Sequence, residues 1–291
     1  MADYAILTDV GGDLPDSMAK ELGIIVLPMS ITLGEKVFNH YADFRECAVG
    51  EFYGELRAGI TAGTAAIPPA VWGEAVEEEL KQGRDALLMP FSREISATYA
   101  NAVIAAEELR MQYPEKKIIV VDTRLASSGS VMGLYLAAMY RREGNGIEET
   151  AEYIVSAKKS LNTYFTVDDL AHLRRGGRIS ATTAVVGSAL GIKPMLQLTP
   201  EGKLESISKA RGRKKSHQML LEYMEKLGRE YDKYPACVAH SDCFEEAEDL
   251  AAQIRERFGT PEVFVVDVGP VIGAHLGVGA IVLSFYGIEQ N

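Results

Sequence analysis

The chain has 291 residues, which suits one large or two ordinary domains with a well-buried core. Hydrophobic residues make up 47% of it and charged residues 24%, a composition typical of globular proteins. The formal net charge of −11 argues against general binding to nucleic acid or to an anionic membrane, since both require a basic surface.

The cysteine content and the N-terminus indicate a cytoplasmic protein. Cys47, Cys237 and Cys243 form no CxxC pair and no metal-like cluster with the five histidines, and a small, odd number of cysteines is typical of reduced thiols. The start, MADYAILTDVGG, lacks a basic segment followed by a long apolar one. No apolar run approaches the ~20 residues that a membrane-spanning helix needs. We therefore expect no metal and no integral membrane segment.

In the first half of the chain, short β-branched runs alternate with longer amphipathic segments. The runs predict strands at 4–9, 24–33, 85–91 and 117–123. Apolar residues at three- and four-residue spacing predict helices at 68–83, 96–113, 128–146 and 147–161. This alternation favours a mostly parallel sheet covered by helices.

The second half has a different pattern. Its β-branched runs predict strands at 163–167, 195–210, 236–241, 262–269 and 280–287, with helices at 215–231 and 244–258. The PEGK turn (200–203) indicates a hairpin of two antiparallel strands. We therefore predict an α/β protein of two domains: an N-terminal one (1–160) with a mostly parallel sheet and a C-terminal one (161–291) with a mixed sheet.

Polar loops adjoin several of the predicted strands and helices, and in open α/β sheets ligands bind at the carboxyl ends of strands. The loops are TDVGGDLP, TAGTAAIPP, FSREISATY and DTRLASSG. Ser, Thr and Asp before a helix usually cap its N-terminus, which explains any single loop. Four hydroxyl-rich loops at one edge weigh against that explanation for all of them.

The sequence lacks the common catalytic motifs. It contains no GxxxxGK[ST], no GxSxG and no HExxH, and the glycines of GPVIGAHLGVG (269–279) do not match the dinucleotide fingerprint. Within that stretch, His275 is either a core histidine bonded to backbone or a donor to a ligand. Hydroxyls, arginines and one imidazole are better suited to binding an anion than to performing a reaction.

Several segments together carry a resemblance to a known family. They are TDVGGDLP, GTAAIPPAVW, FSREISATYANA, VVDTRLASSGSVMGL, FTVDDLAHLRRGGRIS, GIKPMLQL, GKLESISKARGRKK and GPVIGAHLGVGA. In this order and spacing they resemble the DegV family of bacterial fatty-acid-binding proteins. The resemblance implies a two-domain α/β protein with one long-chain fatty acid in a buried tunnel and the carboxylate near the domain junction. Members of the fatty-acid kinase system present that carboxylate to a separate ATP-dependent kinase, which makes acyl phosphate for phospholipid synthesis. The resemblance therefore implies neither a cofactor nor a catalytic residue in this chain.

Residue by residue, the family's hydroxyl positions at the carboxylate correspond to Thr64 and Ser96. Thr61 offers a rival register for the first of them. The family's histidine corresponds to His275, which the resemblance makes a donor to the carboxylate. Arg178, in the RRGGR turn, is a further candidate partner for a carboxylate or carbonyl group.

The sequence departs from the family pattern at Val10, Ala65 and Arg93, where many members have serine. These changes affect the expected rim of the head-group site. We expect the acyl tail to lie among apolar side chains such as those of AVVGSALGI (184–192) and the strands within 263–285.

The basic cluster KARGRKK (209–215) stands out in an acidic chain. Such runs are usually solvated surface. The sharper interpretation is a docking patch for the kinase, with Arg211 and Arg213 as the candidate residues.

An alternative function from another class is an enzyme that uses His275 on a small carbonyl substrate, by analogy with related folds in dihydroxyacetone kinases. A deep apolar cavity would favour the lipid, and a small polar pocket the carbonyl compound.

Overall fold

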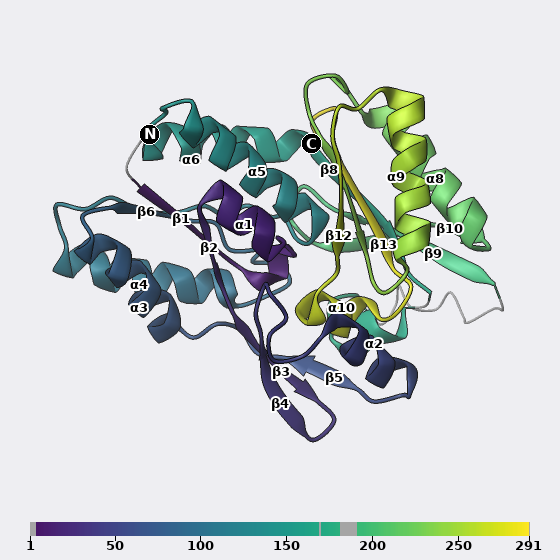
Figure 1. Ribbon diagram of the computed structural model, residues 1–291, viewed down its shortest axis with the longest axis horizontal. Helices are drawn as coiled ribbons and strands as arrows, with labels where there is room; N and C mark the ends of the chain where they lie inside the picture. The colour runs from purple at the N-terminus through teal and green to yellow at the C-terminus, as the bar shows by residue number, and fades with distance from the viewer. Residues whose placement is uncertain (1–3, 169, 181–190, 291) are drawn as a thin grey trace.

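The computed structural model describes residues 4–168, 170–180 and 191–290. Its first layer is a parallel four-stranded sheet in the order β2–β1–β6–β7. The strands are β1 (Tyr4–Asp9), β2 (Ile24–Leu27), β6 (Asp85–Leu88) and β7 (Ile118–Val120). The helices around it are α1 (Asp16–Leu22), α3 (Pro69–Lys81), α4 (Thr98–Gln112), α5 (Ser128–Arg142) and α6 (Ile147–Ala157). Figure 1 shows α3 and α4 on one face of this sheet and α5 and α6 on the other.

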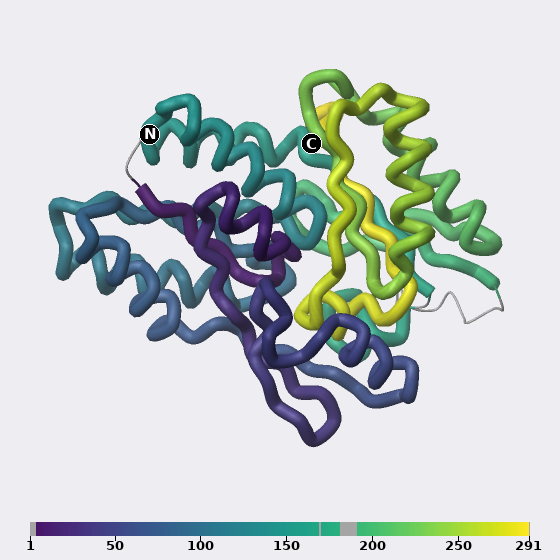
Figure 2. Tube along the Cα trace, in the orientation of Figure 1, coloured from purple at the N-terminus to yellow at the C-terminus, as the bar shows by residue number. Residues whose placement is uncertain are grey.

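The strand predicted at 24–33 is in fact two strands. Pro28 cannot donate a ladder hydrogen bond, and the chain leaves the parallel sheet there. The continuation, β3 (Met29–Leu33), forms a small antiparallel sheet with β4 (Lys36–His40) and β5 (Ala62–Thr64). This small sheet projects from the body of the molecule (Figure 2), and its strand β5 ends at Thr64.

The second large sheet is mixed and has six strands in the order β10–β9–β8–β13–β11–β12. They are β8 (Leu161–Thr166), β9 (Ile192–Leu198), β10 (Leu204–Arg211), β11 (Ala236–His240), β12 (Val263–Asp267) and β13 (Ile281–Tyr286). Only the β11–β12 pair among them is parallel, and β9 and β10 form the predicted hairpin. Helices α8 (Arg213–Leu227) and α9 (Phe244–Phe258) cover one face, burying Leu220 and Leu250 against it. Helix α5 packs against the other face.

Short elements join these layers. They are helices α2 (Val49–Arg57), α7 (Ala171–Arg175) and α10 (Pro270–Leu276) and the 3₁₀ turns η1 (Val10–Gly12) and η2 (Lys158–Ser160). Helix α10 arises in the glycine-rich stretch for which the sequence predicts no element. It begins with Pro270, a residue suited to the first helical position, and ends before Gly277. In Figure 1, α10 lies beside α2, below the six-stranded sheet.

The two halves of the chain share a hydrophobic core. The described strands of the parallel sheet all precede residue 121, and those of the six-stranded sheet all follow residue 160. One cluster of buried residues nevertheless includes Leu7 and Leu125 as well as Phe165 and Val282. The division into domains at residue 160 therefore stays a prediction.

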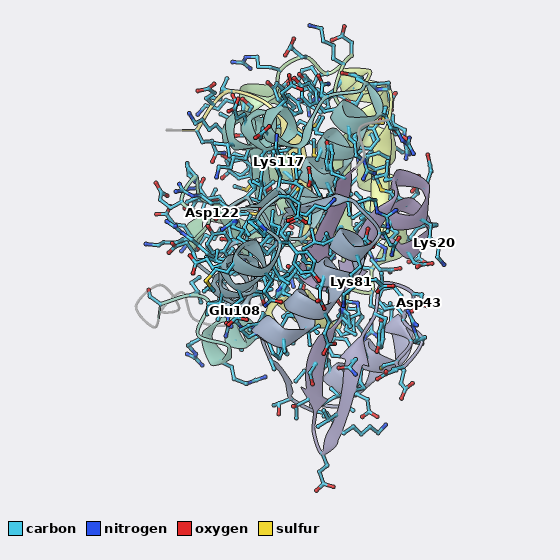
Figure 3. The ribbon with its side chains drawn as sticks, turned by 90° about the vertical axis from the view of Figure 1, so that its left-hand side faces the viewer. Lys20, Asp43, Lys81, Glu108, Lys117 and Asp122 are labelled. Atoms are coloured by element: carbon cyan, nitrogen blue, oxygen red, sulfur yellow. The ribbon has the colours of Figure 1, made fainter. Side chains whose placement is uncertain are left out.

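The outer surface is strongly charged. Figure 3 shows charged side chains spread over the outside of the molecule, among them Lys20 on α1, Lys81 on α3 and Glu108 on α4. Across the described parts of the chain, no helix combines the length and apolar character needed to cross a bilayer.

Candidate functional site

A cavity of about 150 Å³ is lined by residues from both halves of the chain. Most of the described lining residues are apolar: Met29, Ala66, Phe91, Ile95, Ala97, Ala126, Phe165, Leu173, Leu198, Leu204, Val271, Ile272, Leu276 and Val282. Such a surface is suited to an aliphatic ligand, because each buried CH₂ group contributes about 0.8 kcal/mol.

Four polar residues on the cavity wall form what we call its polar end: Thr64, Ser96, Arg178 and His275. Thr64 Oγ1 lies 3.0 Å from His275 Nε2, within hydrogen-bond distance. Thr61, the alternative to Thr64, is exposed and is not among the described lining residues. Thr64 ends the strand β5 and His275 lies in the helix α10, so this contact joins residues 211 positions apart in the chain.

His275 is held as a neutral imidazole. Burial lowers its pKa to about 4, and the positive charge of Arg178 and the neighbouring His172 act in the same direction. At neutral pH the ring therefore has one N–H group. Its Nδ1 edge lies against the backbone of Gly176, where a Cβ atom would overlap the ring. Gly176 is thus required for the close approach of α7 and α10.

Ser96 has a structural as well as a candidate binding role. Its hydroxyl accepts from the Thr98 N–H (3.2 Å) at the start of α4 and donates to Thr98 Oγ1 (3.0 Å). Thr98 Oγ1 in turn accepts from the Ile67 N–H (3.4 Å), and Asn101 Nδ2 donates to the Ile67 carbonyl (2.8 Å). Thr98 and Asn101 therefore tie the loop after Thr64 to the loop of Ser96. Neither Thr98 nor Asn101 was predicted as a site residue from the sequence, although both stand in the matched segment FSREISATYANA.

Arg178 contributes the permanent positive charge of the polar end. Its Nε donates to the Ile95 carbonyl (3.0 Å) and its Nη1 to the Gly176 carbonyl. These bonds fix the guanidinium and leave others of its five N–H groups for a ligand. Among residues 4–168, 170–180 and 191–290, no group of metal-ligating side chains is large enough to hold a metal ion. With its positive charge and remaining N–H donors, Arg178 makes the polar end suited to an anion.

Two further hydroxyls on the cavity wall have partners within the protein. Ser127 Oγ donates to Asp13 Oδ2 (2.6 Å), and Thr163 Oγ1 lies 2.7 Å from Ser284 Oγ. Because these bonds satisfy them, the wall beyond the polar end can be covered by an aliphatic chain without leaving a hydroxyl unpaired.

Similarity to known proteins identifies the family of this chain. The family model described as "Uncharacterised protein, DegV family" matches residues 3–287. The chain belongs to the DegV family. A DegV domain-containing protein of Clostridium perfringens is 40% identical over 99% of this chain and 98% of its own.

Solved DegV structures share the architecture. A DegV family protein from Thermus thermophilus, described as fatty acid binding, is 27% identical with a TM-score of 0.85, covering 98% of this chain and 100% of its own. The fatty acid kinase B3 protein of Streptococcus pneumoniae, solved with linoleic acid, has a TM-score of 0.86 over 99% of this chain and 100% of its own. That protein is 20% identical, so the likeness shows the fold alone. The expected α/β architecture of parallel and mixed sheets is confirmed.

The departures from the DegV pattern lie off the described cavity wall. Val10 is buried in the core, Ala65 is exposed, and Arg93 forms ion pairs with Glu94 and Asp122. Arg93 instead lies on an open groove of about 770 Å³ that adjoins the cavity. The groove and the cavity share several residues, namely Ile95, Ser96, Ala97, Arg178 and Leu204.

The expected tail-lining segments fall partly within the described chain. Residues 184–190 lie outside it. Within 263–285, the apolar lining residues are Val271, Ile272 and Leu276 of helix α10 and Val282 of strand β13. The apolar wall thus comes from α10 and β13 as well as from β8 and β9, which contribute Phe165 and Leu198.

The two arginines of the basic cluster have different environments. Arg211, at the end of edge strand β10, is exposed. Arg213 begins α8 and donates to Glu246 Oε2 (2.6 Å), Asp168 Oδ1 (2.9 Å) and the Gly279 carbonyl (2.7 Å). Arg213 thus holds together α8, α9 and the loop after α10. The docking role of both residues stays a prediction.

Proposed function

We propose that the protein binds one long-chain fatty acid and presents its carboxylate to a separate ATP-dependent kinase, which forms acyl phosphate. The observation that carries this proposal is the polar end of a mainly apolar cavity, which Thr64, Ser96, Arg178 and His275 line together. This arrangement matches the amphipathic character of a fatty acid. The fatty acid binding described for the Thermus thermophilus relative supports the proposal.

The carboxylate would accept hydrogen bonds from the Thr64 hydroxyl and the Arg178 guanidinium, and from the Ser96 hydroxyl once its proton turns away from Thr98 Oγ1. Hydrogen bonds to a charged group contribute about 1.5–3 kcal/mol each. If Nε2 of the neutral His275 carries the ring proton, it can donate to Thr64 Oγ1, which frees the threonine proton for the ligand. His275 then orients Thr64, while Arg178 supplies the opposite charge.

The acyl tail would supply most of the affinity. About fifteen methylene groups contribute roughly 12 kcal/mol before ordering and association costs. A cavity of about 150 Å³ is smaller than the roughly 300–1,000 Å³ of typical ligand pockets. A long tail would therefore enter by displacing flexible lining side chains such as Met29, and the bound cavity would be wider than this one.

The kinase would approach through the groove that shares Ser96 and Arg178 with the cavity. The alternative, an enzyme using His275 on a small carbonyl compound, has weaker support. An imidazole with a pKa of about 4 is a poor general base at neutral pH, and the cavity wall is mainly apolar.

Native mass spectrometry of the purified protein, followed by lipid extraction, tests the binding role. We expect about one long-chain fatty acid per chain, because burial of the tail makes dissociation slow. Delipidated protein should gain thermal stability with myristic, palmitic or stearic acid. Absence of that gain would refute fatty-acid binding. Acyl-phosphate formation with kinase and ATP then tests the presenting role separately.

A further inference from the structure

Helix α10, which carries His275, is anchored at its start by a buried aspartate from the other end of the chain. The N–H of its N-cap residue, Gly269, donates to Asp13 Oδ1 at 2.9 Å across 256 positions of sequence. Asp13 is 7% exposed. The His40 ring lies so close to Gly269 that a Cβ atom there would overlap it. This end of α10 therefore has little freedom to shift.

The second oxygen of Asp13 reaches the wall of the cavity. Ser127 Oγ donates to Asp13 Oδ2 at 2.6 Å, and Ser127 is a lining residue. As the N-cap of α5, Ser127 would ordinarily use its hydroxyl to cap that helix, yet it makes no such bond. Both residues have left-handed backbones, Asp13 at φ 50° and Ser127 at φ 49°. This conformation is unfavourable for residues other than glycine, and such strain persists only where surrounding contacts enforce it.

Helix α10 transmits the position of Gly269 to His275. The Gly269 carbonyl accepts from the Gly273 N–H (2.8 Å), and the Gly273 carbonyl accepts from the Gly277 N–H (2.8 Å). The Tyr53 hydroxyl donates to the Val268 carbonyl (2.7 Å), which fixes the residue just before the helix. A shift at the start of so short and constrained a helix moves its C-terminal end, where His275 meets Thr64.

We propose that Asp13 is a positioning residue for the carboxylate site: its two oxygens hold the helix of His275 against the cavity wall at Ser127. This inference rests on the proposed function. It adds a residue that does not touch the ligand but determines whether His275 and Thr64 lie within hydrogen-bond distance.

Several groups around Asp13 disfavour its charged form. Burial raises its pKa to about 8, and the carboxylates of Asp267 and Asp9 act in the same direction. The other titratable groups that face it, Tyr53, Cys237 and His40, are uncharged at neutral pH. Ionised Asp13 accepts from both Gly269 and Ser127, whereas in neutral Asp13 the second bond reverses, so that Asp13 accepts from Gly269 and donates to Ser127 Oγ. An asparagine offers the same acceptor and donor as the neutral form. Asp13→Asn is therefore the conservative variant, and Asp13→Ala removes both bonds.

The test compares the dissociation constants for palmitic acid and for hexadecanol, which shares the tail but lacks the carboxylate. In Asp13→Ala we expect the preference for the acid to fall about tenfold, as for the loss of one charge-assisted hydrogen bond. Asp13→Asn should keep the wild-type preference. As a second readout, the ring ¹⁵N resonances of His275 should respond to palmitic acid in wild type and Asp13→Asn but not in Asp13→Ala.

Asp16→Ala provides the matched control, because Asp16 is three positions from Asp13 and its side-chain hydrogen bond is to Lys20 within α1 rather than to α10 or Ser127. If Asp13→Ala does not fold, Asp13→Gly replaces it, since glycine accepts the left-handed backbone without strain. Equal losses for acid and alcohol, or an unchanged His275 response, would overturn the positioning role. Failure of the wild type to bind palmitic acid would instead refute the proposed function.

Discussion

At the level of single residues, different side chains of the polar end supply its positive charge and orient its hydrogen-bonding hydroxyl group. Burial and Arg178 keep His275 neutral, so the ring aligns a hydroxyl rather than supplying a cation. Arg178, fixed by two backbone carbonyls, supplies the charge. An arrangement of this kind can hold a carboxylate without a second buried cation, whose desolvation would be unfavourable.

Replacing Thr64 by valine should weaken fatty-acid binding by roughly 1–3 kcal/mol, because an isosteric side chain leaves a carboxylate oxygen without its donor. Titration calorimetry with palmitic acid measures this loss. Thr61→Val is the matched control and should bind as wild type, since Thr61 is exposed. The reverse pattern would assign the head-group threonine to position 61.

Ser96→Ala should also weaken binding by roughly 1–3 kcal/mol. It additionally removes the acceptor for the Thr98 N–H, so we expect the free energy of unfolding to fall by about 1 kcal/mol. Binding of palmitic acid and urea denaturation separate the two effects. Wild-type affinity together with lower stability would leave Ser96 with only its structural hydrogen bonds to Thr98.

Gly176→Ala should displace His275, because the added Cβ would overlap the ring at Nδ1. We expect weaker binding of palmitic acid with the secondary structure retained by circular dichroism. The neighbouring Gly177 has φ +71° and open space around it, so Gly177→Asn, which tolerates that conformation, is the control. Equal affinities in the two variants would show that the approach of Gly176 to His275 is unimportant.

The sequence could single out candidate residues but not the contacts that support them. Thr64, Ser96 and His275 stand in segments with recognisable sequence patterns, and the structure brings them to one cavity wall. Asp13 also stands in a matched segment, but its partner is a backbone N–H 256 positions away. No periodicity or spacing indicates such a pairing, because glycine's N–H has no side-chain signature.

At the level of elements, long amphipathic helices and buried strands were predictable, and short ones were not. Helix α9 coincides with the range predicted from its periodicity, 244–258. Strands β4 and β5 and helices α7 and α10 are too short for a period to be visible. The site depends on such elements, since Thr64 ends β5 and His275 lies in α10. This is why its geometry required the structure.

The two arginines of the basic cluster should behave differently. Arg213→Ala should lower the free energy of unfolding by about 1–3 kcal/mol, because it removes bonds to α9 and to the Gly279 carbonyl. Arg211→Ala should leave stability unchanged, since Arg211 is exposed. Both variants should retain fatty-acid binding.

With kinase and ATP, Arg211→Ala should slow acyl-phosphate formation, with a weaker kinase interaction and a steeper penalty as salt rises. Arg213→Ala is expected to show the same defect if it also serves docking. Unchanged acyl-phosphate formation in both variants would show that the basic cluster is ordinary solvated surface. Loss of fatty-acid binding in these variants would instead indicate that the basic cluster contacts the ligand.

At the level of the whole molecule, buried aspartates should shape the dependence of stability on pH. The pKa of Asp13 is about 8 in the folded state against an ordinary value of 3.8. Its neutral form thus gives a stability contribution that is complete below about pH 4 and lost as the pH rises through 8. The stability of the wild type relative to Asp13→Asn should therefore decline across this window, by on the order of 1 kcal/mol per pH unit, and level off above it.

Urea denaturation of both proteins between pH 5 and 9 measures this difference in stability. About three pH units of that range lie below the folded-state pKa of Asp13, and there the difference should change with pH. Asp9, whose pKa is about 7, is present in both proteins, so most of its own contribution cancels, and its repulsion of ionised Asp13 forms part of the measured difference. If the free energies of unfolding of the two proteins changed with pH in parallel, Asp13 would be ionised throughout this pH range.

The position of β13 has a consequence for biosynthesis. This last strand lies between β8 and β11, in the middle of the six-stranded sheet. Until β13 has been synthesised, β8 and β11 have no strand to join them. The nascent chain must therefore keep two sheet edges unpaired until Ile281–Tyr286 leave the ribosome. We expect nascent chains that stop before β13 to depend on holding chaperones, and ligand capture to begin only after β13 has joined the sheet.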